Sequence, residues 1–147
     1  MKIKSIPPLY LLLSVLLIIS FYFIFPGLNI VPRPYNLGGI ILMFLGFIIV
    51  GKAKDLFKKF VTPTSFEKST FLIAEGIFNY SRNPMYLGMV LFLTGFSICF
   101  GNIISLVIPF IFLSIMAYVF IPYEEKKMKI TFGNDYLDYK RKVRRWF

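Results

Sequence analysis

The chain has 147 residues, of which 57% are hydrophobic, 19% aromatic and 16% charged, and soluble domains are only about 45 to 50% apolar. This composition excludes an ordinary soluble protein and indicates a membrane protein of net charge +10. Because histidine is absent and Cys99 is the one cysteine, a disulfide framework and imidazole acid-base catalysis are excluded, and we predict no metal site.

Four apolar segments predict an all-α integral membrane protein with four transmembrane helices. They cover residues of about 9–25, 36–50, 85–100 and 103–123. The first follows Lys2 and Lys4, as in a signal peptide, but no small-residue cleavage site follows it, so we expect a retained helix. A straight span needs roughly 20 residues, which makes the second and third segments short.

The last two apolar segments are predicted to form a helical hairpin. Only Gly101 and Asn102 separate them, so no room remains for a soluble loop. Pro109 lies inside the fourth segment and predicts a kink, because proline is tolerated in membrane helices when neighbours satisfy the freed carbonyl group.

Two pairs of glycines suggest where helices approach each other closely. Gly39 and Gly46 are seven residues apart, and so are Gly88 and Gly95, which places each pair on one helix face. The alternative is that glycine is simply common in membrane helices.

A loop at 51–84 and a tail at 124–147 complete the predicted single domain, residues 1–147. The loop begins with KAKDLFKKF, which either extends the second helix or lies along the membrane surface, and TPTS then breaks the helix. Residues 66–86 are half apolar and are expected to pack against the bundle. The tail is predicted to be an amphipathic helix, or two pieces hinged at Gly133, because one set of residues recurs at helical spacing: Glu125, Met128, Phe132, Tyr136, Tyr139 and Val143.

The basic residues predict the orientation. All lysines and arginines except Arg33 fall in the N-terminus, the loop or the tail, which four helices place on one side. The positive-inside rule therefore predicts a cytoplasmic membrane protein with both termini in the cytoplasm. The same residues flank apolar spans, so anionic membrane lipids explain the net charge better than nucleic acid, and no nucleic-acid partner is expected.

Polar residues gather at the predicted cytoplasmic end of the hairpin. Arg82 precedes the third helix, and Glu124 and Glu125 follow the fourth, so they should lie within reach of each other. Ionisable groups at the hydrocarbon boundary are costly unless partnered, and they suggest a functional site. An interfacial salt bridge with an aromatic belt explains the same pattern equally well.

Two stretches, LIAEGIFNYSRNPMYLG at 72–88 and EEKKMKITFGNDYLDYKRKVRRW at 124–146, resemble the isoprenylcysteine carboxyl methyltransferase family, itself similar to the membrane phospholipid methyltransferases. The family pattern is an Arg-His/Asn-Pro-x-Tyr-x-Gly stretch, a helical hairpin, a Glu-Glu pair and Phe-Gly-x-x-Tyr-x-x-Tyr. The matching positions are Arg82, Asn83, Pro84, Tyr86, Gly88, Glu124, Glu125, Phe132, Gly133, Tyr136 and Tyr139.

The resemblance implies an S-adenosylmethionine-dependent methyltransferase with the cofactor at the cytoplasmic end of the last helices, enclosed by the tail. A lipophilic or prenylated acceptor would enter from the bilayer, and isoprenylcysteine-type O-methylation of a carboxylate is the expected reaction. The implied catalytic residues are Arg82, Glu124 and Glu125. The implied cofactor-binding residues are Asn83, Pro84, Tyr86, Gly88, Glu124, Tyr136 and Tyr139.

Some features leave other functions open. Asn83 stands where many relatives have histidine, whereas the 35 residues between Gly88 and Glu124 favour the isoprenylcysteine branch over the phospholipid branch. A small lipid or isoprenoid acid is an equally open acceptor. The two alternatives are an NADPH-dependent sterol-type reductase and a non-catalytic membrane protein whose basic tail binds lipid or a partner.

Overall fold

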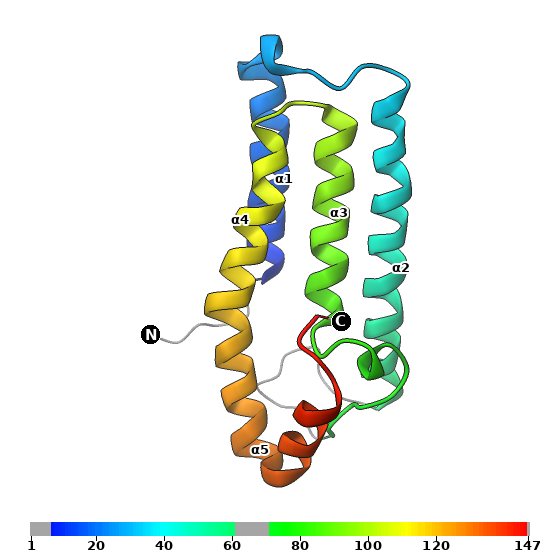
Figure 1. Cartoon of the computed structure of the whole chain (residues 1–147), viewed down its shortest axis with the longest axis vertical. Helices are drawn as coiled ribbons and strands as arrows, with labels where there is room; N and C mark the ends of the chain where they lie inside the picture. Colours follow the sequence, from blue (N-terminus) through cyan, green and yellow to red (C-terminus); the bar gives the residue numbers. More distant parts are fainter. Residues whose placement is uncertain (1–6, 61–70, 147) are drawn as a thin grey trace.

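The computed structural model describes residues 7–60 and 71–146, and within these ranges the chain is built from helices without named strands (Figure 1). The α-helices are α1 (Pro7–Ile24), α2 (Gly38–Lys59), α3 (Pro84–Phe100), α4 (Ile108–Ile115) and α5 (Ile121–Lys142). A π-helical turn, Met116–Phe120, joins α4 to α5, and short 3-10 turns lie at Pro26–Leu28, Tyr35–Leu37, Gly76–Asn79 and Ser105–Val107. The predicted all-helical class is confirmed.

Within the described ranges, three helical segments are long and apolar enough to cross a membrane: Pro7–Ile24, Tyr35–Lys59 and Ser105–Lys142. The fourth apolar helix is α3, and its 17 residues correspond to about 26 Å of helix. This length is slightly below the roughly 30 Å hydrocarbon core of a bilayer. The charged part of the third segment begins only at Glu124, so its apolar part is residues 105–123.

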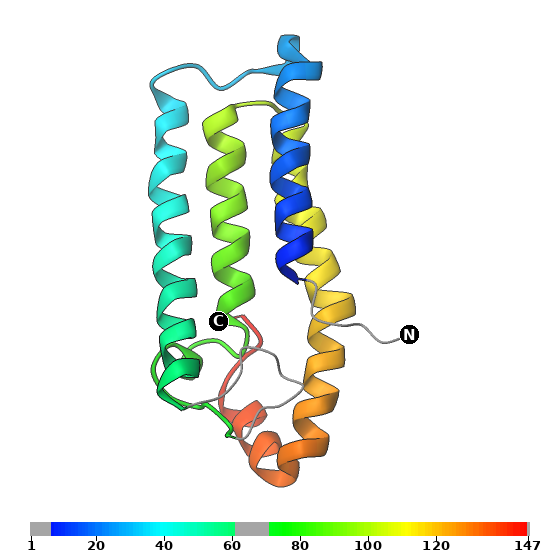
Figure 2. The ribbon, with the colours of Figure 1, turned by 180° about the vertical axis from the view of Figure 1, so that it is seen from behind.

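Helix α3 lies between α2 on one side and α1 and α4 on the other, as both views show (Figures 1 and 2). Its contact with α2 depends on the predicted glycine pairs. A Cβ atom on Gly46 would lie 2.5 Å from the carbonyl oxygen of Gly88, and Gly39 meets Gly95 in the same way. The antiparallel backbones therefore approach more closely than any side chain would permit, which confirms the glycine prediction.

On its other side α3 packs into the main apolar core. Fully buried side chains from α1, α3, α4 and α5 meet there, among them Ile18, Leu93, Phe112 and Ile121. Their burial fixes the position of the α3 axis, and hence of the residues at its first turn.

Asn102 holds together the end of the bundle where α1 connects to α2 and α3 to α4. Its completely buried amide nitrogen donates to the carbonyl oxygens of Phe21 and Phe25 and to Oδ1 of Asn29, at 3.3, 3.0 and 2.9 Å. Its Oδ1 accepts the backbone N–H of Ile104 at 3.1 Å. A single side chain thus satisfies backbone groups at the end of α1, in the connection that follows it and in the connection between α3 and α4.

One open alternative is decided, and two predictions about the hairpin need correction. The second helix continues past Val50 to Lys59, as the first alternative for KAKDLFKKF predicted, because KAKDLFKK keeps an apolar face that buries Ala53 and Phe57. The hairpin connection is longer than two residues, since an irregular turn and a 3-10 turn precede α4 at Ile108. Pro109 therefore occupies the first turn of α4 rather than its interior, where its missing N–H costs nothing.

The end of the bundle where α2 stops at Lys59 and α3 starts at Pro84 carries most of the cationic residues, and we call it the basic end. The described part of the 51–84 loop packs here as predicted, with Ile73 and Phe78 against α2. The predicted TPTS break and Lys2, Lys4 and Lys68 lie outside the described residues.

The tail folds back at Gly133, as predicted. This residue has φ 53° and ψ −122°, a conformation that favours glycine, and it divides α5 into two pieces. Figure 1 shows the second piece turning back beneath the bundle. Its apolar face is buried, with Tyr136, Tyr139 and Val143 clustered against Leu72. The tail thereby closes the basic end.

Candidate functional site

The RNPMY stretch forms the entry into α3 at the basic end. Pro84 stands in the first turn of the helix, where proline is favoured because its fixed φ suits a helix start. Asn83 is the residue before it and is buried. This entry places Tyr86 in the first turn of α3, with 5% of its surface exposed.

Tyr86 contacts the first glutamate of the pair. Its hydroxyl group donates to Oε1 of Glu124 at a distance of 2.6 Å. The prediction that the two ends of the hairpin meet is therefore confirmed, and the sequence motif on α3 is connected directly to the motif on α5.

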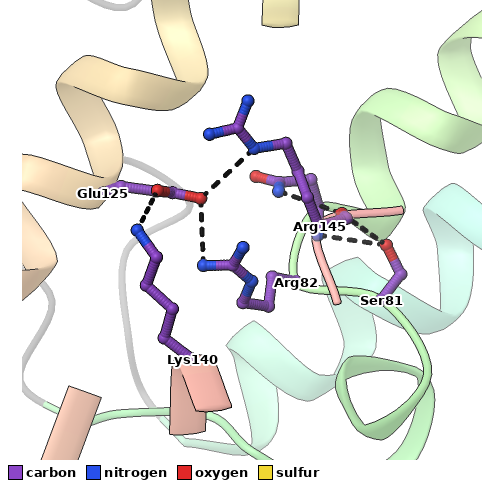
Figure 3. A network of polar contacts seen from close by, with 6 residues as sticks. Ser81, Arg82, Glu125, Lys140 and Arg145 are labelled. Carbon is purple, nitrogen blue, oxygen red and sulfur yellow. Dashed lines mark hydrogen bonds and ion pairs between the residues drawn. The ribbon is translucent and has the colours of Figure 1, made fainter. Parts of the chain in front are cut away.

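The second glutamate lies at the centre of a cationic cluster (Figure 3). Glu125 Oε1 is 3.0 Å from Nη1 of Arg82 and 3.5 Å from Nε of Arg145, and Oε2 accepts a hydrogen bond from Lys140 at 2.8 Å. The side chains of Arg82 and Glu125 are only 9% and 11% exposed. The predicted Arg82 partner is thus Glu125, whereas Glu124 is held by Tyr86.

The C-terminal segment is attached to the loop that carries the motif. The backbone N–H of Arg82 donates to the carbonyl oxygen of Arg144 at 3.1 Å. Ser81 Oγ and Asn83 Nδ2 both donate to the carbonyl oxygen of Arg145, at 3.2 Å each (Figure 3). Together with the Glu125 ion pairs, these bonds hold the tail against the start of α3.

The pKa values of Glu124 and Glu125 differ, although the two residues are adjacent at the end of the apolar part of the helix. The difference arises from the charged groups around each carboxylate. Burial raises the pKa of Glu124 to about 7, against smaller opposing effects of the Tyr86 hydrogen bond and the Lys127 charge. Burial also raises the pKa of Glu125, but the Lys140 hydrogen bond and the charges of Arg82, Lys140 and Arg145 outweigh it and lower the pKa below its ordinary value. Glu125 is consequently a fixed anion, whereas Glu124 titrates near neutrality.

A large groove opens beside these residues. It has a volume of about 790 Å³ and is lined by residues of α1, α2, α3 and α5. We call it the lateral groove. Its walls come from α1 and α2 and include Pro7, Leu11, Phe47, Val50, Gly51 and Lys54. Its floor comes from α3 and α5 and includes Tyr86, Gly88, Met89, Phe92, Tyr123 and Glu124. The volume falls within the roughly 300 to 1,000 Å³ typical of small-molecule sites.

A second, inner cavity of about 30 Å³ lies under the tail and is lined mainly by aromatic and apolar side chains. These include Phe57, Phe71, Phe78, Met128, Tyr136 and Tyr139. Four residues line both cavities: Phe78, Arg82, Asn83 and Glu124. We call the place where these four residues lie the junction of the two cavities.

Several buried polar atoms at this junction lack a hydrogen bond from the described residues. They are Nε and Nη1 of Arg82, Oε2 of Glu124 and Oε1 of Glu125. Arg82 Nη1 and Glu125 Oε1 form an ion pair with each other, which compensates for the missing hydrogen bonds of these two atoms. Glu124 Oε2 and Arg82 Nε have no hydrogen bond from the described residues, although the charge of Lys127 acts on Glu124 and the Arg82 guanidinium pairs with Glu125, and buried groups of this kind are normally hydrogen-bonded. One acceptor and one donor therefore remain available for a ligand.

The other predicted site residues occupy less direct positions. Pro84 starts α3, and Gly88 contacts α2 while also lining the lateral groove. Tyr136 lines the inner cavity, as does Tyr139, whose hydroxyl group donates to the carbonyl oxygen of Phe78 at 2.7 Å. Tyr139 is thus engaged in holding the tail.

Sequence reasoning missed several residues of the site. Ser81, Lys140 and Arg145 complete the contacts between loop and tail, and α1 and α2 provide the groove walls. The charge pattern of the sequence attributes the basic tail residues to membrane lipids and predicts no partner for Lys140 or Arg145. No local pattern distinguishes Lys140 or Arg145 from their basic neighbours, whereas the groove walls follow from how the helices pack.

Comparison with known proteins agrees with this arrangement. The model of the family described as phospholipid methyltransferase matches residues 35–135, which include the motif at the start of α3 and the glutamate pair. An uncharacterized protein of Haemophilus influenzae is 36% identical over 62 residues, which cover 42% of this chain and 98% of that protein. No solved structure matches. Since the family model covers more than half of the chain, the protein belongs to the phospholipid methyltransferase family of membrane methyltransferases.

Proposed function

We propose that this protein is an integral membrane enzyme that transfers a methyl group from S-adenosylmethionine to a lipid-like acceptor. The acceptor nucleophile is a carboxylate, as in isoprenylcysteine-type O-methylation, and residues 1–147 act as one domain. Family membership establishes a methyltransferase of the membrane class. The cofactor, the acceptor and the residue roles are the parts proposed.

The observation that carries the proposal is the junction of the two cavities. Arg82, Asn83 and Glu124 line both the lateral groove and the inner cavity. A two-substrate transfer reaction needs such a place, because the donor and acceptor must meet in line while water is excluded. The residues at the junction are also those of the family motifs.

The polar and aromatic side chains around the junction suit the chemical groups of the cofactor. S-adenosylmethionine supplies an electrophilic methyl group on a sulfonium and carries an ammonium group, a carboxylate and an adenine. Oε2 of Glu124 has no hydrogen bond from the described residues and suits a cationic group. Asn83 offers its side-chain oxygen as an acceptor, while its Nδ2 donates to the carbonyl oxygen of Arg145. Tyr136 and Tyr139 offer aromatic faces.

The inner cavity has room for little more than one or two water molecules, so it cannot hold the cofactor in the described conformation. The cofactor would occupy the junction and the end of the lateral groove nearest to it, or displace the tail. The tail is fastened by polar contacts that involve Arg82, Glu125 and Arg145, and these contacts can break and re-form. The tail would thus act as a lid.

The acceptor chemistry suits a site without histidine. A carboxylate acceptor is already ionised at neutral pH and needs no general base. The buried Nε of Arg82 has no hydrogen bond from the described residues, and Arg82 is the residue proposed to orient the acceptor anion, while Glu125 fixes the guanidinium. The basic end is proposed to face the cytoplasm, in accordance with the positive-inside rule.

The test is calorimetric binding with the full chain in mild detergent. The titrants are S-adenosylmethionine, its demethylated product S-adenosylhomocysteine and, separately, NADPH. We expect binding of the first two, with at least a tenfold loss of affinity in Glu124→Ala. Glu75→Ala is the matched control, because Glu75 pairs with Lys59 at the exposed surface and lies outside both cavities.

Binding of NADPH instead would assign the protein to reduction chemistry and contradict the proposal. Absence of binding by all three compounds in folded protein would favour a non-catalytic role. Equal affinity in Glu124→Ala and the unmodified protein would remove Glu124 from the cofactor site.

A further inference from the structure

The lateral groove is polarised along its length. Towards the middle of the bundle it is bounded by apolar side chains, and there the ring of Phe47 packs edge-on against that of Phe92, with centroids 5.1 Å apart. Towards the basic end its lining carries three cations, Lys54, Arg82 and Lys127, and one anion, Glu124. An occupant that matches both ends has a hydrocarbon chain and an anionic headgroup.

One side of the groove is a regular stripe of α2. Phe47, Gly51 and Lys54 follow each other at spacings of four and three residues and therefore share a face of the helix. Consecutive members are about 4.5 to 6 Å apart along the helix axis. The stripe thus passes from an aromatic side chain through an open position to a cation.

Gly51 differs from the glycines that hold α2 against α3. A Cβ on Gly46 or Gly88 would collide with backbone atoms, whereas a Cβ on Gly51 would meet nothing within 4 Å. Helix packing therefore does not require glycine at position 51, and glycine is costly in a helix interior relative to alanine. The space it leaves belongs to the groove.

Lys54 also lacks an obvious structural partner. It is exposed, lines the groove and forms no ion pair with any residue in the described ranges. Arg82, by contrast, is buried beside Glu125, and Lys127 lies over the ring of Tyr123 at 4.7 Å from its centroid. Lys54 is therefore the exposed groove cation that can pair with an incoming anion, in addition to Arg82, which is proposed to orient the acceptor at the junction.

We propose that Gly51 and Lys54 select the acceptor: Gly51 leaves the passage for a hydrocarbon chain between α1 and α2, and Lys54 pairs with an anionic group on the acceptor headgroup. The inference rests on the proposed methyl transfer, because it names the class of molecule that occupies the groove. It assigns acceptor specificity to α2, outside the family motifs on α3 and α5.

The first experiment measures occupancy of the groove without requiring turnover. The full chain in phosphatidylcholine vesicles is photolabelled with palmitic acid that carries a diazirine in its chain, and labelled positions are located by mass spectrometry. The uncharged probe is the corresponding fatty alcohol. We expect the acid to label the α2 stripe around Phe47 and Gly51.

Two variant pairs separate the chain and headgroup contributions. Gly51→Leu should reduce labelling of the stripe by both probes at least fivefold, whereas Gly38→Leu, at an equally open position of α2 outside the groove, should leave it unchanged. Lys54→Ala should reduce labelling by the acid about fivefold but not labelling by the alcohol, and Lys54→Arg should restore it. Lys58→Ala is the control for an exposed lysine of α2 outside the groove.

Normal labelling of the stripe in Gly51→Leu would overturn the proposal that a hydrocarbon chain passes Gly51. A loss of labelling in Gly38→Leu as large as that in Gly51→Leu would also overturn it. An equal loss of both probes in Lys54→Ala would overturn the headgroup contact. Competition by unlabelled palmitate identifies a carboxylate headgroup, and competition by phosphatidic acid identifies a phosphate headgroup. Phosphatidylcholine is present throughout and is the background.

A second readout distinguishes this inference from the proposed function. Binding of S-adenosylhomocysteine to Gly51→Leu should stay within twofold of the unmodified protein, while kcat/KM for methylation of a farnesylated cysteine derivative should fall at least tenfold. If the unmodified protein binds no cofactor but is labelled in the predicted pattern, the methyltransferase proposal fails and lipid binding in the groove stands. If cofactor binds but the labelling pattern is absent, the groove inference alone fails.

Discussion

The hydroxyl group of Tyr86 donates a 2.6 Å hydrogen bond to Glu124, and this contact connects the two sequence motifs that lie 38 residues apart. It fixes one carboxylate oxygen and leaves the other buried and without a hydrogen bond from the described residues. The bond therefore orients Glu124 towards the junction of the two cavities without using all of its capacity.

Removing this bond should weaken cofactor binding. Tyr86→Phe deletes only the hydroxyl group, and hydrogen bonds to charged groups contribute about 1.5 to 3 kcal/mol. We expect the Kd for S-adenosylhomocysteine to rise roughly tenfold or more in calorimetric titration. Tyr118→Phe, at an exposed position, is the matched control and should not change the Kd.

Cofactor affinity should depend on pH through Glu124. Because the pKa of Glu124 in the unliganded protein is about 7, a falling pH protonates the carboxylate that is proposed to pair with the cofactor cation. Affinity should therefore increase between pH 6 and pH 8. A Glu124→Gln variant should bind more weakly and show a flat profile, and an unchanged slope in this variant would contradict the assignment.

The raised pKa of Glu124 should also make the free energy of unfolding depend on pH, but in the opposite direction to cofactor affinity. Between the ordinary pKa of 4.5 and about 7, the folded state holds more protons at Glu124 than the unfolded state does. The contribution of this residue to the free energy of unfolding must then decrease as pH rises through that window. Thermal unfolding without cofactor should show this trend, and Glu124→Gln should reduce it.

The ion cluster should determine whether the tail stays closed. Glu125→Ala leaves Arg82 buried without its anion, and losing one partner of a buried pair costs about 3 to 5 kcal/mol. We expect faster proteolysis and hydrogen exchange of the described tail, residues 124–146. Glu75→Ala breaks an exposed pair, which is worth no more than about 1 kcal/mol, and should leave the tail protected.

The glycine contact between α2 and α3 makes a separate prediction about stability. Gly39→Ala forces a Cβ against the backbone of Gly95 and should destabilise the bundle by about 1 to 3 kcal/mol. Gly38→Ala adds the same methyl group into open space, so it should be neutral. Thermal unfolding of both variants in the same detergent compares the two positions, and equal stability would show that the close approach is not needed.

Local patterns in the sequence predicted much of this structure. The apolar segments located the helices, the seven-residue glycine spacing located the α2–α3 contact, and the tail periodicity with Gly133 predicted a bent amphipathic helix. These features depend on neighbours within one or two turns, which is the range over which helical patterns operate. Continuation of the second helix beyond Val50 was one of two alternatives, and the sequence could not choose between them because the continuing face is buried only by the folded loop.

The sequence by itself therefore determined the membrane class, the helices and the two motifs that carry the family resemblance. Only the tertiary structure decided which glutamate pairs with Arg82 and which with Tyr86, and that Lys140 and Arg145 join the cluster. It also decided that α1 and α2 form the walls of the lateral groove. The physical reason is that adjacent glutamates on a helix point about 100° apart, so their partners depend on the packing of distant helices and not on spacing along the chain.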